Sequence, residues 1–171
     1  MNKFYRILRY EWPLHFILLF TNWLPDNIFF INLRGKLASP FFKKCGKNLG
    51  LGRNLSFVSS YKMEIGDNVY IAIGSWFNGD IIIESDVLIG PYCILATNTH
   101  TKENSISFRF GGNKEGKIII KFGSWVAGQS MLVGNSELGI GSALAANSVL
   151  SKKTDDCELW GGVPAKLIKK I

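Results

Sequence analysis

Aliphatic residues recur at every sixth position along two long stretches of the chain. The first series is Ile65, Ile71, Phe77, Ile83, Ile89 and Leu95, and the second is Ile120, Val126, Leu132, Leu138, Leu144 and Leu150. A weaker series starts at Leu49 and Leu55. Helices repeat about every 3.6 residues and strands every two. A period of six is a multiple of two, so it keeps one face of a strand apolar throughout and predicts short β-strands.

The residue four places after each aliphatic one also faces inward. In the second series these residues are Ser124, Ser130, Ser136, Ser142, Ser148 and Thr154, and in the first they are Val69, Ser75, Ile81, Val87, Cys93 and Thr99. Mostly small inward residues fit a narrow interior. Short strands joined by corners would stack into a parallel β-helix, with coils about 4.8 Å apart. The period alone fixes neither the number of faces nor the handedness.

The pattern resembles the hexapeptide-repeat acyltransferases, whose repeat is an aliphatic residue, glycine, two variable residues, a small residue and one more. The chain matches their ending with "GSWVAGQSMLVG", "ALAANSVLSKK" and "GGVPAKLIKKI". The resemblance covers roughly residues 49–171 and implies an all-β fold, a left-handed parallel β-helix with three faces. Its coils would be 65–82, 83–100, 120–137 and 138–155, after an incomplete first coil at 49–60. The run "WFNGDIIIESDVLIGPYCILATNTHTKEN" most resembles the O-acetyltransferases of capsule and exopolysaccharide synthesis.

The chain outside the repeats is expected to be helical at both ends. Residues 1–48 form a basic, apolar N-terminal segment, and residues 49–160 form the β-helix with an extruded loop at 101–119. Residues 161–171 are predicted to be a short capping helix, because Pro164 suits the first turn of a helix. Its apolar residues, Leu167, Ile168 and Ile171, would cover the last coil.

The N-terminal segment carries the charge of the whole chain. Residues 1–60 contain nine Lys or Arg and two acids, which account for the net charge of +7. The apolar run "WPLHFILLFTNWLP" is shorter than the roughly 20 residues that a spanning helix needs. Two interpretations are open and compatible: helices in a membrane interface, anchored by Trp12 and Trp23, or a cap over the first coil. Nucleic-acid binding is disfavoured, because the aromatic residues are not interleaved with the cations.

The first interpretation predicts that residues 1–33 attach a cytoplasmic protein to the inner face of a bacterial cytoplasmic membrane. The three cysteines, Cys45, Cys93 and Cys157, have no metal-ligand spacing and are expected to be free thiols. A metalloenzyme of the carbonic-anhydrase type shares this fold but needs three histidines, and the repeat region has one. No metal is expected.

The phase of the repeat breaks after Leu95 and resumes at Ile120, and long excursions from a regular fold are usually functional. His100 stands at the base of this loop, where the resembled family places its catalytic histidine. An imidazole can accept the proton of a sugar hydroxyl as that hydroxyl attacks a thioester. Asn98 and Asp80 are candidates for orienting the imidazole, with Asp80 one coil below Asn98. Asn78 is the position that matches the polysaccharide branch of the family.

The resemblance also implies a homotrimer that binds acetyl-CoA in a groove between two subunits. Small residues would let pantetheine approach the main chain, and lysines would suit the phosphates. The residues expected to contact acetyl-CoA are Trp125, Gly128, Ala146, Ser151, Lys152, Lys166 and Lys169. Asn147 departs from the glycine that the family carries there.

The sequence therefore predicts an acetyl-CoA-dependent O-acetyltransferase that acts on a surface polysaccharide of a bacterium or its lipid-linked precursor, with His100 as general base. Two alternatives remain at this stage. One is an N-acyltransferase acting on an amino sugar or small molecule. The other is a β-helix that binds without catalysis.

Overall fold

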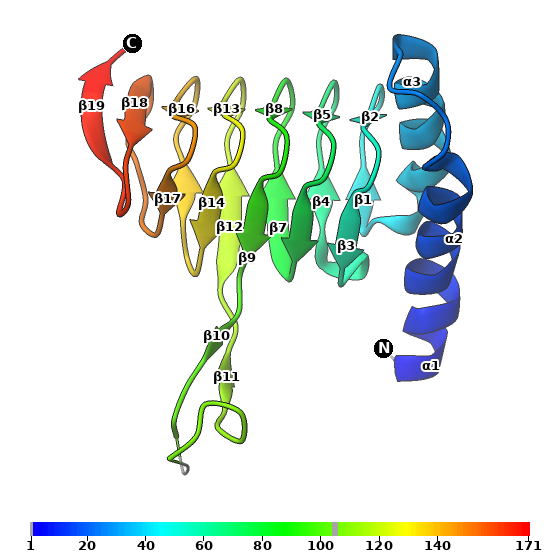
Figure 1. Cartoon of the computed structure of the whole chain (residues 1–171), viewed down its shortest axis with the longest axis horizontal. Coiled ribbons are helices and arrows are strands. Elements are labelled where there is room, and N and C mark those ends of the chain that lie inside the picture. The colour runs from blue at the N-terminus through cyan, green and yellow to red at the C-terminus, as the bar shows by residue number, and fades with distance from the viewer. Residues whose placement is uncertain (1, 104–105) are drawn as a thin grey trace.

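The computed structural model, which describes residues 2–103 and 106–171, is a parallel β-solenoid closed at one end by helices (Figure 1). Strands of successive coils pair in parallel, so three sheets run along the axis. Sheet A holds β1 (Lys44–Cys45), β4 (Glu64–Ile65), β7 (Asp80–Ile83), β12 (Lys117–Ile120) and β15 (Glu137–Leu138). Sheet B holds β2 (Gly50–Leu51), β5 (Tyr70–Ile71), β8 (Leu88–Ile89), β13 (Trp125–Val126), β16 (Ala143–Leu144), β18 (Glu158–Gly161) and β19 (Lys166–Lys170). Sheet C holds β3 (Ser56–Val58), β6 (Trp76–Asn78), β9 (Ile94–Ala96), β14 (Met131–Val133) and β17 (Val149–Leu150).

The predicted parallel β-helix is confirmed, and its left-handed sense stays an expectation from the resemblance. The register gives the length of a coil: Tyr70 pairs with Leu88, 18 positions later. The first coil is longer, because Gly50 pairs with Tyr70, 20 positions later. A short 3-10 turn at Ser60–Lys62 lies between these two coils. The solenoid begins with β1 at residue 44, upstream of the expected start at residue 49.

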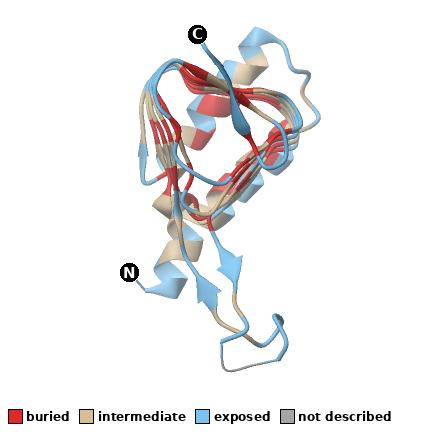
Figure 2. Cartoon of the chain, turned by 90° about the vertical axis from the view of Figure 1, so that its left-hand side faces the viewer, coloured by how far each residue is buried: buried red, intermediate tan, exposed pale blue. Residues whose placement is uncertain are grey.

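The interior is built as the period of six requires. Aliphatic residues of the repeat, such as Ile71, Val126 and Leu144, are completely buried. Figure 2 shows the three-sided coils nearly end on, with buried positions of successive coils lined up along the sides. The small inward positions also tie the coils together. The hydroxyl of Ser124 donates to the carbonyl of Gly139 at 2.6 Å, and that of Ser130 donates to Ala145 at 2.8 Å.

The helices cover the open end of the first coil. They are α1 (Lys3–Arg6), a π-helical stretch (Ile7–Glu11), α2 (Trp12–Thr21), α3 (Ile28–Ala38) and a 3-10 turn (Ser39–Phe41). We call residues 3–41 the helical cap. Leu14, Leu18 and Ala38 of the cap belong to the same apolar cluster as the repeat residues. Helix α3 contacts β2, and α2 contacts α3. The cap interpretation therefore describes the inner side of these helices.

The predicted C-terminal helix is wrong. The chain reverses at Gly162, which has a φ of +98°, and β19 then pairs antiparallel with β18. A helix would have left the outer edge of β18 unpaired, whereas a strand satisfies its backbone groups. Leu167, Ile168 and Ile171 are exposed rather than packed on the last coil, and Trp160 and Ala165 are buried there instead.

Candidate active site

The break in the repeat is a two-stranded hairpin that leaves the solenoid between coils three and four. Asp80 pairs with Lys117, 37 positions later, where a regular coil would give 18, so the excursion adds 19 residues. Its strands are β10 (Thr99–His100) and β11 (Asn113–Lys114), which pair antiparallel. Figure 1 shows the hairpin projecting away from the solenoid, roughly perpendicular to its axis. The predicted length of the loop agrees with the structure.

The position of the loop differs by three residues from the prediction of 101–119. The hairpin closes where the amide of Gly116 donates to the carbonyl of Thr97 at 3.0 Å. The chain has therefore left the coil by Asn98, and Thr99 and His100 belong to the hairpin rather than to the end of a coil. Lys117 takes the place opposite Asp80 that Asn98 would have held. The repeated Ile-Ile-Ile runs at 81–83 and 118–120 are the sequence signal that would have given this register.

His100 is exposed and lies opposite Asn113 in the hairpin. Within residues 2–103 and 106–171, no side chain forms a hydrogen bond with its ring. The three residues proposed to orient it gather at the corner from which the hairpin departs. Asn78 accepts a hydrogen bond at its carbonyl from the amide of Thr97 at 3.1 Å, and Asn98 accepts one at Oδ1 from the Thr97 hydroxyl at 3.0 Å.

This corner is tightly built. Gly79 lies between Asn78 and Asp80 with a φ of +104°, and a Cβ atom there would lie 1.7 Å from the Thr97 hydroxyl oxygen. Asp80 forms a long ion pair with Lys117, at 3.9 Å between the charged atoms. Lys117 is a residue that the sequence reasoning missed. The corner thus offers amide, hydroxyl and carboxylate groups at the root of the arm that carries His100.

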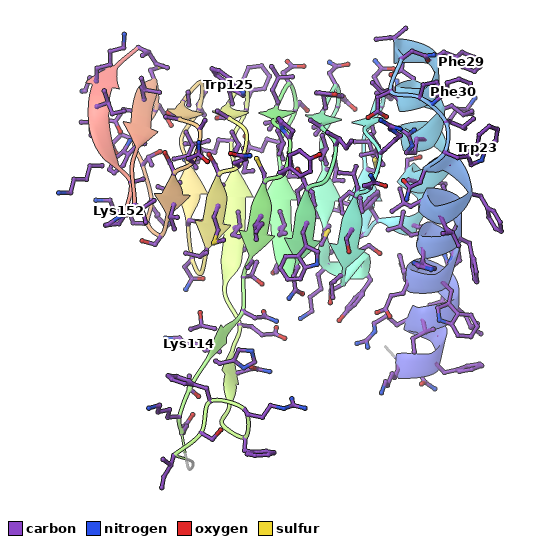
Figure 3. All side chains as sticks on the ribbon, in the orientation of Figure 1. Trp23, Phe29, Phe30, Lys114, Trp125 and Lys152 are labelled. Carbon is purple, nitrogen blue, oxygen red and sulfur yellow. The ribbon has the colours of Figure 1, made fainter. Side chains whose placement is uncertain are left out.

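A hollow of about 250 Å³ lies on one side of the hairpin root. Thr97, Thr99, Lys114 and Asn135 are among its lining residues, and His100 is not. Neighbouring residues of a strand point to opposite faces, so Thr99 faces this hollow and His100 faces away from it. Lys114 lies on the hairpin, well outside the coils (Figure 3).

The residues expected to bind the acyl donor are spread over several corners. Gly128 and Ala146 do lie on adjacent coils, since the amide of Asn147 donates to the carbonyl of Gly128 at 3.2 Å. Trp125 projects from sheet B with 52% of its surface exposed. In Figure 3 Trp125 lies at the edge of the solenoid away from the hairpin, whereas Lys152 lies toward the C-terminal end. Within one chain, Gly128 and Ala146 therefore lie together, whereas Trp125 and Lys152 do not share a face.

The charged members of the set are at the C-terminal end of the solenoid. Ser151 and Lys152 are exposed, and the Lys152 ammonium lies 4.7 Å from the centre of the Trp160 ring. Lys166 and Lys169 are exposed on β19. The ring of Trp160 is buried and its Nε1 donates to Glu158 at 2.8 Å, so this tryptophan is a packing residue.

The geometry of the donor corner leaves backbone accessible to an extended ligand. Gly128 is half-buried and stacks on Pro91, and a Cβ atom added to the glycine would approach the proline ring to 3.1 Å. Ala146 and Asn147 above it are exposed. No cluster of His, Cys, Asp or Glu is placed to hold a metal ion in the part of the chain that the structure describes.

Comparison with known proteins finds similar acetyltransferases, although no family model matches the chain. A Staphylococcus aureus (strain Mu50) protein named "Putative acetyltransferase" is 30% identical over 142 residues, which are 82% of this chain and 71% of that protein. A hexapeptide-repeat-containing acetyltransferase from Vibrio cholerae, in complex with acetyl-CoA, is 22% identical with a TM-score of 0.81, covering 99% of this chain and 90% of that one. A maltose O-acetyltransferase from Clostridium difficile 630 is 20% identical with a TM-score of 0.84, covering 99% and 89%.

Proposed function

The chain belongs to the family of hexapeptide-repeat acetyltransferases, and we propose that it moves the acetyl group of acetyl-CoA to a sugar hydroxyl. The observation that carries the proposal is the single interruption among the described coils. There Asn78, Asp80 and Asn98 meet at the root of the arm that bears His100. A solenoid whose other coils are 16 to 20 residues long has no packing reason to extrude 19 residues at this point.

In the proposed reaction, His100 is the general base. The sugar oxygen forms a bond to the thioester carbon while its proton passes to the imidazole, and the carbon–sulfur bond of the tetrahedral species then breaks. The thiolate leaves and takes up a proton, so neither an acyl-enzyme nor a metal is required. A base of this kind contributes about 10²–10⁴-fold to the rate.

We assign the donor to the corner formed by Gly128 and Ala146, with Trp125, Ser151, Lys152, Lys166 and Lys169 as further contacts. The V. cholerae protein binds acetyl-CoA on a solenoid of the same architecture, which supports this assignment. Because Trp125 projects from sheet B and Lys152 follows β17 of sheet C, a single acetyl-CoA touches residues of both kinds most simply between two copies. We therefore propose that the site is completed in a homotrimer.

The outward side of sheet C supports an interface of this kind. Its strands present Trp76, Ile94, Met131 and Val149 outward, on the face that ends at the hairpin corner. In sedimentation velocity at micromolar concentration, the protein should run as a trimer, and Met131→Glu should shift it to monomer. A fully active monomer would rule out the shared site.

We propose that the acceptor is a surface polysaccharide or its lipid-linked precursor. The C. difficile neighbour acts on maltose, a sugar, through its hydroxyl groups. The resemblance of "WFNGDIIIESDVLIGPYCILATNTHTKEN" to the capsule and exopolysaccharide branch supports a polymer or its building unit as the acceptor. Such an acceptor would favour attachment of the protein to the inner face of the membrane.

The test is thiol release from acetyl-CoA with panels of oligosaccharide and amino-sugar acceptors. His100→Ala should lower kcat by about 10²–10⁴-fold while leaving the affinity for CoA unchanged. His15→Ala, on the exposed side of α2, is the matched control and should behave as wild type. Turnover only with amines would favour the N-acyltransferase instead. Wild-type activity of His100→Ala would remove the general base, and no turnover with any acceptor would favour a binding scaffold.

A further inference from the structure

We propose that the outer face of the helical cap docks on the surface of an anionic lipid bilayer, with the solenoid standing away from the membrane. We define this outer face as Phe4, Leu8, Trp12, Phe16, Leu19, Phe20, Trp23, Ile28, Phe29 and Lys36. The inference adds a partner to the proposed function, and it holds or fails independently of which acceptor is acetylated.

The cap helices are apolar on two sides, and only the inner side packs against the solenoid. Leu14 and Leu18 point into the solenoid and are 2% and 5% exposed. Phe4, Leu8, Trp12, Phe16 and Phe20 follow one another at four-residue intervals, which places them on one side of a helix. All five are exposed, Phe20 by 70%. A helix that had only to cover the first coil would carry polar residues on this side.

The loop between α2 and α3 and the start of α3 extend the same apolar surface. Trp23 is 78% exposed, Ile28 77% and Phe29 66%. Figure 3 shows Trp23, Phe29 and Phe30 pointing away from the coils. A contiguous apolar surface of this kind marks an interaction site in a soluble domain, unlike single exposed residues. Tryptophan at the edge of such a surface is typical of a membrane interface.

The positive charge around the outer face favours an anionic lipid surface over a second copy of the chain as its partner. Both acids of residues 2–60 are already neutralised: Glu11 pairs with Arg6 at 3.1 Å, and Asp26 pairs with Arg34 at 3.2 Å and Arg53 at 3.5 Å. By contrast, the described residues offer no ion-pair partner to Lys3, Arg9, Lys36 or Lys47. Lys36 follows Phe29 by two helical turns and so lies on the same side of α3. Cations beside an apolar surface attract anionic headgroups, and a second copy would bring the same positive charge to itself.

The cap can lie on a membrane but is not built to cross one. Within residues 2–103 and 106–171, no helix combines the length and hydropathy that a bilayer span requires. The cap helices run across the end of the solenoid (Figure 1), so docking their outer face would set the solenoid axis away from the membrane. Three coils and one layer of helices then separate the hairpin from the lipid surface, a height of about 25 Å. The hairpin would extend sideways above the membrane, in reach of a sugar chain on a lipid carrier.

The experiment is co-sedimentation of the full-length protein with vesicles of phosphatidylglycerol and phosphatidylcholine, and with vesicles of phosphatidylcholine alone. Binding is expected to the anionic vesicles and to weaken, without vanishing, at high salt. The variant Phe20→Ser/Trp23→Ser/Phe29→Ser removes three exposed anchors and should lower the partition coefficient by about 100-fold. The matched control, Phe108→Ser/Phe110→Ser/Ile168→Ser, removes three exposed apolar side chains elsewhere and should bind as wild type.

A charge variant separates headgroup attraction from insertion. Lys36→Gln should lower binding to anionic vesicles by about fivefold, and Lys170→Gln, at the far end of the solenoid, should not. The cap triple variant should keep wild-type turnover on a soluble acceptor, so loss of docking is distinguishable from failure of the proposed acetyl transfer. The proposal is overturned if the wild-type protein stays in the supernatant with anionic vesicles at low salt. It is also overturned if the cap triple variant binds normally, or if its only effect is to abolish a concentration-dependent association of copies.

Discussion

Replacement of Arg34 by methionine should weaken the attachment of the helical cap to the first coil. Its guanidinium is completely buried, and Nη1 donates both to Asp26 and to the carbonyl of Leu51. Nη2 donates to the carbonyls of Thr21 and Leu24, each at 3.3 Å. The first coil has no preceding coil, so carbonyl groups on that side lack a ladder partner. Arg34 supplies one such partner to Leu51 and binds the end of α2 at the same time.

The size of the effect follows from the acceptors that are left behind. Asp26 keeps Arg53, and the Thr21 carbonyl still accepts from the amide of Leu24 at 3.1 Å. The carbonyls of Leu51 and Leu24 lose the donor that Arg34 gave them. Each buried acceptor without a partner costs about 1–3 kcal/mol, and breaking a buried ion pair from one side costs about 3–5 kcal/mol. We expect Arg34→Met to lower the free energy of unfolding by about 3–5 kcal/mol.

Arg53→Met is the matched control, because Arg53 binds the same carboxylate from the surface at 3.5 Å. An exposed pair contributes at most about 1 kcal/mol. The assay is urea unfolding followed by circular dichroism, in which the helical signal reports on the cap and the sheet signal on the solenoid. Release of the cap ahead of the solenoid would separate the two signals for Arg34→Met. Equal losses in the two variants would refute the argument that burial of Arg34 holds the cap.

Three further predictions concern the surface charges and the thiols. Lys152→Ala and Lys169→Ala should each raise KM for acetyl-CoA more than KM for the acceptor, and equal changes in both would place these lysines outside the donor site. Hydrogen bonds from two lysines lower the pKa of the Glu137 carboxyl, so its contribution to stability is present above pH 4.5 and is lost as the pH falls through the lowered pKa. Glu137→Gln should therefore lose less unfolding free energy than wild type in acid titrations, and identical acid profiles would contradict this. At about pH 8, a disulfide reagent should label exposed Cys157 quickly and Cys45 slowly, because burial raises the pKa of Cys45 to about 11; equal rates would show that burial does not control them.

The regular part of the fold could be predicted from the sequence, because the same local packing requirement recurs in every coil. Each sixth residue must be apolar, and each small inward residue must fit between coils. The residue type of Leu132 or Ser142 alone therefore indicates that its side chain faces the interior. The two ends of the chain do not follow the repeat, and their structure was predicted less accurately. The C-terminal strand was mistaken for a helix because Pro164 and the apolar residues after it suit a helical turn. The open edge of β18, which decides the matter, is a tertiary feature that no local pattern carries.

The sequence placed Asn78, Asp80 and Asn98 near the root of the hairpin, but it did not give the register of the strands there. The loop length is set by where the repeat stops and resumes, whereas its exact root depends on which of two equivalent residues pairs with Asp80. Lys117 takes that place in the structure, which moves Asn98 out of the ladder. Similarly, spacing placed Gly128 and Ala146 together because they share a corner one coil apart. It gave no information on Trp125 and Lys152, which lie on different faces of the same coil stack.

A solenoid of this kind restricts where chemistry can occur. Its inward positions are filled by aliphatic and hydroxyl side chains that hold the coils together, so reactive groups are left to the outward positions, the corners and the ends. The chain uses each of these places differently. The hairpin at one corner carries His100, the small residues at another leave backbone accessible, and the helices at the first coil present an apolar outer face. Because a rigid stack fixes the distances among these three places, binding of the cap to a surface would also fix the height of His100 above it. The reach of the enzyme toward a tethered acceptor would then be set by the number of coils between cap and hairpin rather than by any flexible linker.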